Sequence, residues 1–362
     1  MKDPITVSLC MIVKNEENTI KRCLSSVRDL VDEIIIVDTG SSDSTKDICK
    51  NFTDKIYDFE WTDDFSSARN FSFSMATEDY ILWLDADDIL LPEDIKKFKI
   101  MKESFDSSLD SVTMKYNVGF DEYGNTTLSY RRNRLVKASR NFKWVGFVHE
   151  YLEVHGNIFN SDIAVTHKKI NYSPNRNIQM YENKLKKGIH FSLRDILYYG
   201  NELYDHKRYN MAFQYYSKFL KSDKGWSEDK IRICSNISDY CLSVNKFEKS
   251  RKYIFKSFEY DNPRAEGCCR VGFSFLMENK LHQAVFWYEM ALKLEKPKNS
   301  LGFFNDAYWT WIPHLQLCVC YDKLGNHKLA YFHNEMAGKF RPNDKRILFN
   351  KKYFQNIGIY KM

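Results

Sequence analysis

Three carboxylates lie within four residues at the end of a short apolar run. Residues 80–84 lead directly into Asp85, Ala86, Asp87 and Asp88. Carboxylate oxygens are ligands that Mg²⁺ and Mn²⁺ prefer, and a divalent cation lets acidic residues approach a diphosphate despite its charge. We therefore expect Asp85 and Ala86 to line a nucleoside diphosphate, with Asp85 toward the ribose, and Asp87 to hold the metal. The alternative is that these acids are solvated or cap a helix.

The first third of the chain must supply the elements that position these acids. Short apolar runs at residues 7–13, 33–37, 55–59 and 80–84 alternate with segments of helical periodicity at 17–30, 44–51 and 66–76. This alternation is typical of a parallel sheet covered by helices. Such a sheet binds ligands at the carboxyl ends of its strands, so residues 15–17, Asp38 and residues 85–88 are predicted to meet there.

From about residue 190 the pattern changes to long helical segments without strands. Related segments recur at residues 209–219, 247–258, 281–292 and 327–340, close to the roughly 34-residue period of tetratricopeptide units. Stacked helix pairs of this kind form a curved solenoid with a concave binding face; the alternative is an irregular helical bundle. We predict two domains, residues 1–187 and 188–362.

Composition excludes several classes of protein. The net charge of +6 arises from 54 basic and 48 acidic residues, a mixed surface without the basic stripe of nucleic-acid binders. No apolar stretch approaches the roughly 20 residues that span a bilayer, so we expect no integral membrane segment. The nine cysteines are scattered without a Cys-x-x-Cys pair, which indicates reduced thiols and a cytoplasmic location.

Five short motifs occur in a defined order along the first half of the chain. They are MIVKNEE at 11–17, VDTGS at 37–41, DFSSARN at 64–70, the DXD-type DADD at 85–88 and WVGFVHE at 144–150. Together they resemble the bacterial family 2 glycosyltransferases of GT-A fold that carry tetratricopeptide repeats. Within that group the chain is similar to the peptide S-glycosyltransferases of glycocins, of the sublancin type. The resemblance covers residues 5–180 by motif and the remainder by architecture. It implies an α/β GT-A domain with a Rossmann-like mixed sheet, followed by an all-α tetratricopeptide-like domain.

The resemblance also implies roles for residues that would bind the donor, a UDP-sugar. The backbone near Val13 and the side chain of Glu16 would line the nucleoside, and Asp38 would accept the uracil N–H. Arg69 would meet the nucleotide with its charged fork. Each residue has a structural alternative: Glu16 as an acid of the first helical turn, Asp38 in an Asx-type turn, and Arg69 paired with Asp64.

Further roles fall at the end of the motif-bearing region. Glu150 occupies the place of the family's general base, and the neighbouring His149 could be the base instead or a structural hydrogen-bond partner. His167 occupies the place of a metal-binding histidine, although Lys168 follows it where relatives usually have a glycine-tyrosine pair. A lone histidine can equally be structural. Arg176 is a further candidate for the diphosphate.

We expect an inverting, metal-dependent transferase that moves a hexose or N-acetylhexosamine from a UDP-sugar to a Cys, Ser or Thr side chain of a peptide or protein. The repeats would hold the acceptor and could mediate a homodimer. One alternative keeps the chemistry but makes the acceptor a cell-surface glycan or a lipid-linked sugar. The second is a non-catalytic repeat scaffold with a nucleotide-binding domain.

Overall fold

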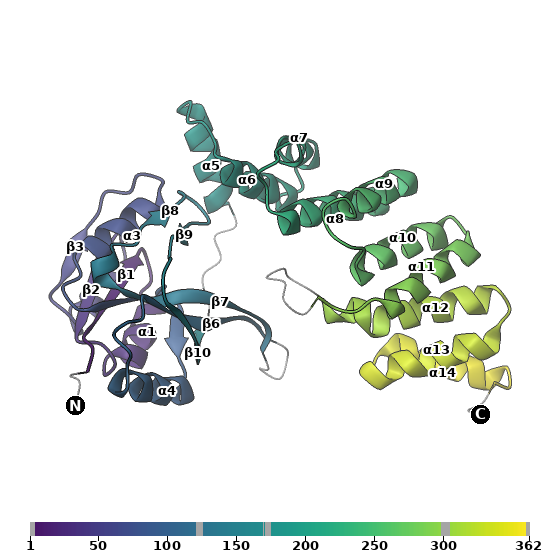
Figure 1. Ribbon diagram of the computed structural model, residues 1–362, viewed down its shortest axis with the longest axis horizontal. Coiled ribbons are helices and arrows are strands. Elements are labelled where there is room, and N and C mark those ends of the chain that lie inside the picture. The colour runs from purple at the N-terminus through teal and green to yellow at the C-terminus, as the bar shows by residue number, and fades with distance from the viewer. Residues whose placement is uncertain (1–3, 121–125, 169, 171–174, 298–304, 360–362) are drawn as a thin grey trace. The chain divides into compact units, whose positions relative to one another are not determined.

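The computed structural model describes residues 4–120, 126–168, 170, 175–297 and 305–359 (Figure 1). The chain divides into two compact units, Met1–Glu202 and Leu203–Met362. The first is the predicted mixed α/β domain and the second is entirely helical among its described residues. The division falls inside a helix, and the domain boundary predicted after residue 187 stays a prediction.

The first unit is built on an eight-stranded mixed sheet of order β3-β2-β1-β4-β7-β6-β10-β5. Strand β1 pairs in parallel with β2 and β4, and β7 pairs antiparallel with β4 and β6. The strands are β1 (Val7–Val13), β2 (Glu33–Asp38), β3 (Ile56–Asp58), β4 (Tyr80–Trp83), β5 (Asp88–Leu90), β6 (Ser111–Phe120), β7 (Thr126–Lys137) and β10 (Ile158–His167). The four strands expected from the apolar runs are thus present.

Side chains alternate between the two faces of a strand, so those of β1 pack into two different cores. Leu9 and Met11 pack into one core, together with residues of helices α1 (Ile20–Val27) and α4 (Pro92–Glu103). Cys10 packs into the other, with residues of helix α3 (Phe65–Ser74) and of the two-stranded ribbon β8 (Trp144–Val145) and β9 (Tyr151–Leu152). Figure 1 shows α1 and α4 on one face of the sheet and α3 with the ribbon on the other.

A further group of helices and one 3₁₀ turn complete the first unit. They are α2 (Thr45–Cys49), the 3₁₀ turn η1 (Ala138–Arg140), α5 (Arg176–Lys186) and α6 (Leu193–Asp205). Helix α6 begins in the first unit and extends three residues past its end at Glu202. Among the described residues no helix is long and apolar enough to cross a membrane.

In the second unit, the same kind of turn joins several pairs of successive helices. They are α7 (Tyr209–Leu220), α8 (Ser227–Ser243), α9 (Phe247–Ser257), α10 (Ala265–Met277), α11 (Leu281–Lys293), α12 (Trp311–Lys323), α13 (His327–Phe340) and α14 (Lys345–Asn356), with a 3₁₀ turn η2 (Asp306–Trp309). The four segments that recur in the sequence are α7, α9, α11 and α13. The predicted recurrence therefore corresponds to one helix of each repeating unit.

The turns before α9, α11 and α13 share their backbone conformation. Asn245, Asn279 and Gly325 have φ of +57°, +57° and +76°. The N–H of the residue after each donates to the carbonyl five positions earlier, at 2.7, 2.9 and 2.9 Å. This is the Schellman end of a helix, for which a left-handed residue is required. Its repetition confirms the tetratricopeptide-like architecture over an irregular bundle.

Candidate active site

The ends of β1, β2 and β4 bring the predicted nucleotide-binding residues to one edge of the sheet. Val13 and Asp38 are register partners at the ends of β1 and β2, and the acidic stretch follows β4. The carbonyl of Val13 accepts the N–H and the hydroxyl of Thr39 at 2.9 and 3.1 Å. Asp38 Oδ1 accepts the N–H groups of Gly40 and Ser41 at 2.9 and 2.8 Å. The Asx-type turn that was the alternative for Asp38 is therefore present.

The second oxygen of Asp38 is an unused acceptor. Asp38 is 1% exposed, and its Oδ2 is buried without a hydrogen-bond partner among the described residues. Buried polar atoms are nearly always paired, so an orphan at a strand end points to a ligand. The group that fits it is an N–H donor, such as the imide of uracil.

Arg69 links two carboxylates that lie far apart in the chain. Its Nε donates to Glu150 Oε1 at 2.8 Å and its Nη2 donates to Asp85 Oδ1 at 2.7 Å. The guanidinium lies over the rings of Trp83 and Trp144, at 5.1 and 4.7 Å from their centroids. This environment lets a buried cation keep two partners in fixed directions.

Asp64, the alternative partner of Arg69, has another function. Its Oδ1 accepts the N–H of Ser67 at 3.0 Å and so caps the N-terminus of α3. That cap fixes the start of the helix that carries Arg69.

Partial burial raises the pKa of the Asp85 carboxyl, but the charges of Arg69 and Arg134 outweigh this effect and lower the pKa well below its usual range. Asp85 is therefore ionised at neutral pH and can accept hydrogen bonds.

A potential metal-binding group forms beside Asp85. Ligand atoms of Asp87, Asp88 and His167 lie within 4.8 Å of one another. The antiparallel pairing of β5 with β10 places His167 opposite Asp88. His167 Nδ1 lies 3.3 Å from Asp87 Oδ1, 3.1 Å from Asp88 Oδ1 and 2.9 Å from the Tyr116 hydroxyl.

The donor set fits Mn²⁺ or Mg²⁺. Burial lowers the pKa of His167, but hydrogen bonds to Asp87 and Asp88 outweigh it and raise the pKa to about 9. A proton on the imidazole therefore holds the two acids together when no cation is bound. A metal would have to displace this proton, as metal binding to imidazole generally does.

Asp88 is held by an arginine that sequence reasoning missed. The side chains of Arg134 and Asp88 are both fully buried, and Arg134 Nη2 lies 3.0 Å from Asp88 Oδ2. The guanidinium lies 3.9 Å from the centroid of Trp83. Asp88 Oδ2 also accepts the N–H of Asp85 at 3.1 Å, so Asp88 fixes the acidic turn from inside.

Arg132 is the second arginine on this face of β7. Both guanidiniums lie against the ring of Trp83, with Arg132 at 5.9 Å and Arg134 at 3.9 Å from its centroid. The Arg132 guanidinium lies 5.5 and 5.4 Å from the ring centroids of Tyr116 and Tyr130, and among the described residues it forms no ion pair with a carboxylate. The spacing of basic residues by two within a predicted strand would have been the signal for both arginines.

His149 and Glu150 point to different partners. Glu150 faces Arg69, whereas His149 Nε2 lies 2.9 Å from Glu202 Oε1 on α6. The His149 ring also stacks on Tyr198, with centroids 4.4 Å apart and an interplanar angle of 17°. The structure therefore joins Glu150 to Asp85 through Arg69 and holds His149 as a hydrogen-bonded residue against α6.

The remaining predicted residues surround the acidic turn. Ala86 is buried between the two acids of the DXD-type motif. Glu16 precedes α1, and partial burial raises its pKa; a hydrogen bond from Thr19 opposes the rise, and the charge of Asp87 adds to it. Arg176 begins α5, is exposed, and lies over the ring of Phe65 at 4.8 Å. The donor-binding roles of these residues stay predictions.

The family of the first unit follows from this arrangement and from one comparison. Residues 8–164 match the family model described as Glycosyl transferase family 2. The N-terminal unit is a family 2 glycosyltransferase domain. Its matched span includes the sheet edge, the acidic turn, Arg69 and Glu150. His167 and α6 lie beyond it.

The chain is also similar to several curated proteins over part of its length. The chain is 32% identical over 244 residues to the SPbeta prophage-derived glycosyltransferase SunS of Bacillus subtilis, which covers 63% of this chain and 56% of SunS. It is 52% identical over 87 residues to a TPR repeat-containing protein of Synechococcus elongatus, covering 24% of this chain and 22% of the relative. An uncharacterized glycosyltransferase of Rickettsia typhi is 37% identical over 87 residues, covering 24% and 30%. These alignments span less than two thirds of the length of each relative.

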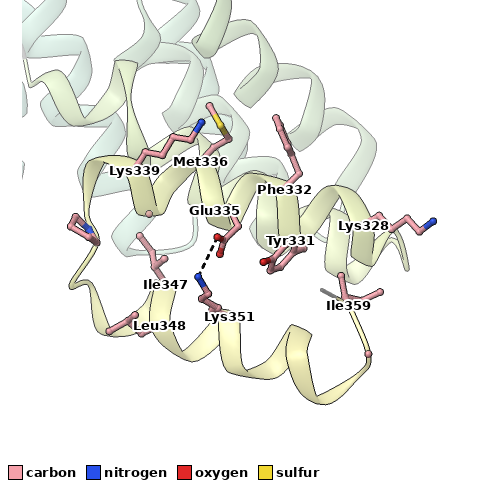
Figure 2. A pocket seen from close by; sticks show the side chains of 13 residues that line it. Lys328, Tyr331, Phe332, Glu335, Met336, Lys339, Ile347, Leu348, Lys351 and Ile359 are labelled. Carbon is pink, nitrogen blue, oxygen red and sulfur yellow. Dashed lines mark hydrogen bonds and ion pairs between the residues drawn. The ribbon is translucent and has the colours of Figure 1, made fainter. Parts of the chain in front are cut away.

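A separate cavity lies in the second unit. Its volume is about 1020 Å³, and its walls come from α13, α14 and the residues next to them. Figure 2 shows Glu335 and Lys351 paired across it, at 3.3 Å between Oε2 and Nζ. Phe332 and Leu348 contribute apolar walls and are 52% and 44% exposed. The lining also includes Lys328, Lys339 and Met336, so the cavity combines apolar and charged side chains.

Proposed function

We propose that this protein is an inverting, metal-dependent glycosyltransferase that moves a hexose or N-acetylhexosamine from a UDP-sugar to a Cys, Ser or Thr side chain of a peptide or protein. The observation that carries the proposal is the bridge formed by Arg69. One guanidinium holds Asp85, on the donor side, and Glu150, on the acceptor side. A transferase needs both sides in fixed relation, because transfer requires near-attack geometry.

The donor would bind along the ends of β2, β1 and β4. Asp38 Oδ2 accepts the uracil imide N–H, Val13 and Glu16 line the nucleoside, and Asp85 and Ala86 lie along the ribose and the sugar. Asp87 and His167 hold the divalent cation, with Asp88 behind them. When bound, the cation neutralises charge on the departing diphosphate.

Two arginines complete the donor side in this proposal. Arg132 is a cation in an aromatic setting that forms no ion pair at contact distance among the described residues, and in this proposal it meets the diphosphate or the sugar. Arg176 extends from the start of α5 and supplies a second charge. Arginine suits this task because its planar fork matches phosphate oxygens and stays charged at every working pH.

On the acceptor side, Glu150 receives the proton of the thiol or hydroxyl. A bond forms between the acceptor sulfur or oxygen and the anomeric carbon, and the bond from that carbon to the diphosphate oxygen breaks. UDP leaves with the electron pair of that bond. Attack occurs on the face opposite the leaving group, so the configuration at the anomeric carbon inverts.

The nature of the acceptor is the finer part of the proposal. The motifs resemble those of peptide S-glycosyltransferases, and a repeat unit with an exposed apolar cavity suits an extended peptide. An acceptor on a cell-surface glycan or a lipid-linked sugar remains the second candidate. The contacts of Arg69 with both Asp85 and Glu150 argue against a non-catalytic scaffold. Such a scaffold needs no group aligned opposite the donor.

The test is incubation of the protein with a panel of UDP-sugars, Mn²⁺ and candidate acceptors, followed by mass spectrometry. The acceptors are cysteine-containing peptides, their serine analogues, and glycan and lipid-linked acceptors. A hexose or N-acetylhexosamine mass increment on a peptide side chain is the expected result. An increment only on the glycan or lipid acceptors would overturn the peptide assignment. Absence of transfer and of donor hydrolysis throughout would overturn the enzyme assignment.

A further inference from the structure

The segment that carries Glu150 has no regular structure of its own. Residues 146–150 connect β8 and β9 without helix or strand. Gly146 has φ +96° and His149 has φ +53°. The left-handed region is rarely adopted by a residue with a side chain, and such a conformation persists only where the surroundings enforce it. The conformation of His149 therefore calls for contacts that hold it.

Three residues of α6 hold His149. Glu202 Oε1 lies 2.9 Å from the imidazole Nε2, and Tyr198 stacks on the ring. Arg194 Nη2 donates to the backbone carbonyl of His149 at 3.0 Å. The same Arg194 guanidinium lies 4.7 Å from the Tyr198 ring centroid, so the side chain, the ring and the carbonyl of His149 are fixed together.

Helix α5 and Phe191, which precedes α6, add a second anchor to the same segment. The ring of Phe147 contacts Tyr181 and Phe191, with centroids 5.0 and 5.9 Å apart. Tyr181 is fully buried and also contacts Tyr199 of α6, at 5.3 Å. Glu202 joins the two helices, since its Oε1 also accepts from Asn177 Nδ2 of α5 at 3.0 Å.

We infer that Glu202 positions the acceptor-side base: through His149 it fixes the backbone next to Glu150, while Arg69 fixes the carboxylate. The inference rests on the proposed function for the identity of the base. Helix α6 follows the matched family span, and the sequence predicted that it belongs with the repeats. The inference instead assigns this helix to the catalytic apparatus. Glu202 is a positioning residue, because in this inference it acts through its contact with His149.

The experiment compares full-length variants of one position with a matched control. Glu202→Leu removes both hydrogen bonds, and Glu202→Gln keeps an acceptor oxygen for His149. Glu103→Leu removes an exposed carboxylate at the end of α4. For Glu202→Leu we expect kcat to fall by about 10- to 100-fold, the range that a small misplacement of a catalytic group produces. The KM for the UDP-sugar should change little. Glu202→Gln should restore most of kcat, and Glu103→Leu should behave as wild type.

A second readout does not depend on activity. Hydrogen–deuterium exchange of peptides spanning residues 146–152 should rise in Glu202→Leu and stay at the wild-type level in Glu103→Leu. If the wild type transfers no sugar but exchange rises as described, the proposed function fails and the contact between α6 and the segment stands. Unchanged exchange together with unchanged kcat, or a raised donor KM at unchanged kcat, would overturn the positioning role.

Discussion

Arg69 Nε donates to Glu150 Oε1 at 2.8 Å while its Nη2 donates to Asp85 Oδ1 at 2.7 Å. The guanidinium is planar, so the two carboxylates are held at a fixed separation and angle. One belongs to the acidic turn after β4 and the other to the segment between β8 and β9. A lysine would supply the charge but not the two directions, which makes Arg69 the residue that couples donor and acceptor sides.

The role of Glu150 is tested by Glu150→Gln, which keeps the shape of the side chain and removes the proton acceptor. We expect kcat to fall about 10²-fold or more, as general-base loss usually causes. UDP affinity should change little. The control is Glu153→Gln, at an exposed position three residues along the chain. Normal turnover in Glu150→Gln would place the base elsewhere, with His149 as the first residue to examine.

Metal dependence is tested by Asp87→Ala and by chelation. Loss of this carboxylate should abolish transfer and weaken Mn²⁺-dependent UDP binding in calorimetry, with an unchanged circular dichroism spectrum. His167→Ala should weaken the same metal-dependent binding, because it removes the coordinating nitrogen. Full turnover in excess EDTA would contradict both expectations.

The buried pair of Arg134 and Asp88 should be important for stability. Arg134→Leu removes one partner of a fully buried ion pair, and breaking such a pair typically costs about 3–5 kcal/mol. We expect a clearly lower unfolding midpoint in urea. Arg131→Leu is the comparison on the same strand, because Arg131 is exposed and its guanidinium donates only to Thr113 Oγ1 and the Ser161 carbonyl among the described residues, at 3.3 and 2.6 Å. Equal midpoints for the two variants would show that the pair contributes little.

Stability should fall in mild acid because of two histidines in the repeats. His314 Nδ1 and His333 Nδ1 lie 2.9 Å apart, so at least one of these nitrogens must be unprotonated. Burial, together with the nearby His314, lowers the pKa of His333 to about 4, from an ordinary 6.5. The neutral form is favoured in the fold, so this stabilisation is complete above pH 6.5 and is lost as the pH falls toward 4.

The size of this effect follows from the shift. A shift of about 2.5 units corresponds to about 3 kcal/mol in the free energy of unfolding. Urea unfolding of the wild type at pH 7 and pH 4.5 should show most of this loss. In His333→Asn, which keeps a polar atom near the Nδ1 position, the difference between the two pH values should shrink. An equal difference in both proteins would assign the acid sensitivity to other groups.

The cavity between α13 and α14 should affect the acceptor and not the donor. Phe332→Ser removes an apolar wall, and we expect the KM for a peptide acceptor to rise several-fold with the KM for the UDP-sugar unchanged. Phe286→Ser, at an aromatic residue of α11 that is 55% exposed and outside the cavity lining, is the control. If neither variant alters the acceptor KM, the cavity is not the acceptor site.

Much of the fold follows from local patterns in the sequence. Apolar runs of strand length mark β1 to β4, and the recurring aromatic-rich segments mark α7, α9, α11 and α13. The alternation of strands and helices also places Asp38 and Asp85 at the same edge of one sheet, after β2 and β4. These features are local because periodicity and turn residues depend on adjacent positions, and the carboxyl ends of parallel strands share an edge.

The contacts that organise the candidate site depend on the tertiary structure. His167 meets Asp88 only because β5 pairs antiparallel with the end of β10, 79 residues away in the chain. Arg134 reaches Asp88 from β7, and Glu202 reaches His149 from a helix that the sequence assigns to the repeats. No local pattern records such pairings. Sequence alone therefore determined which residues carry charge at the strand ends, and strand register and helix packing decided which of them meet.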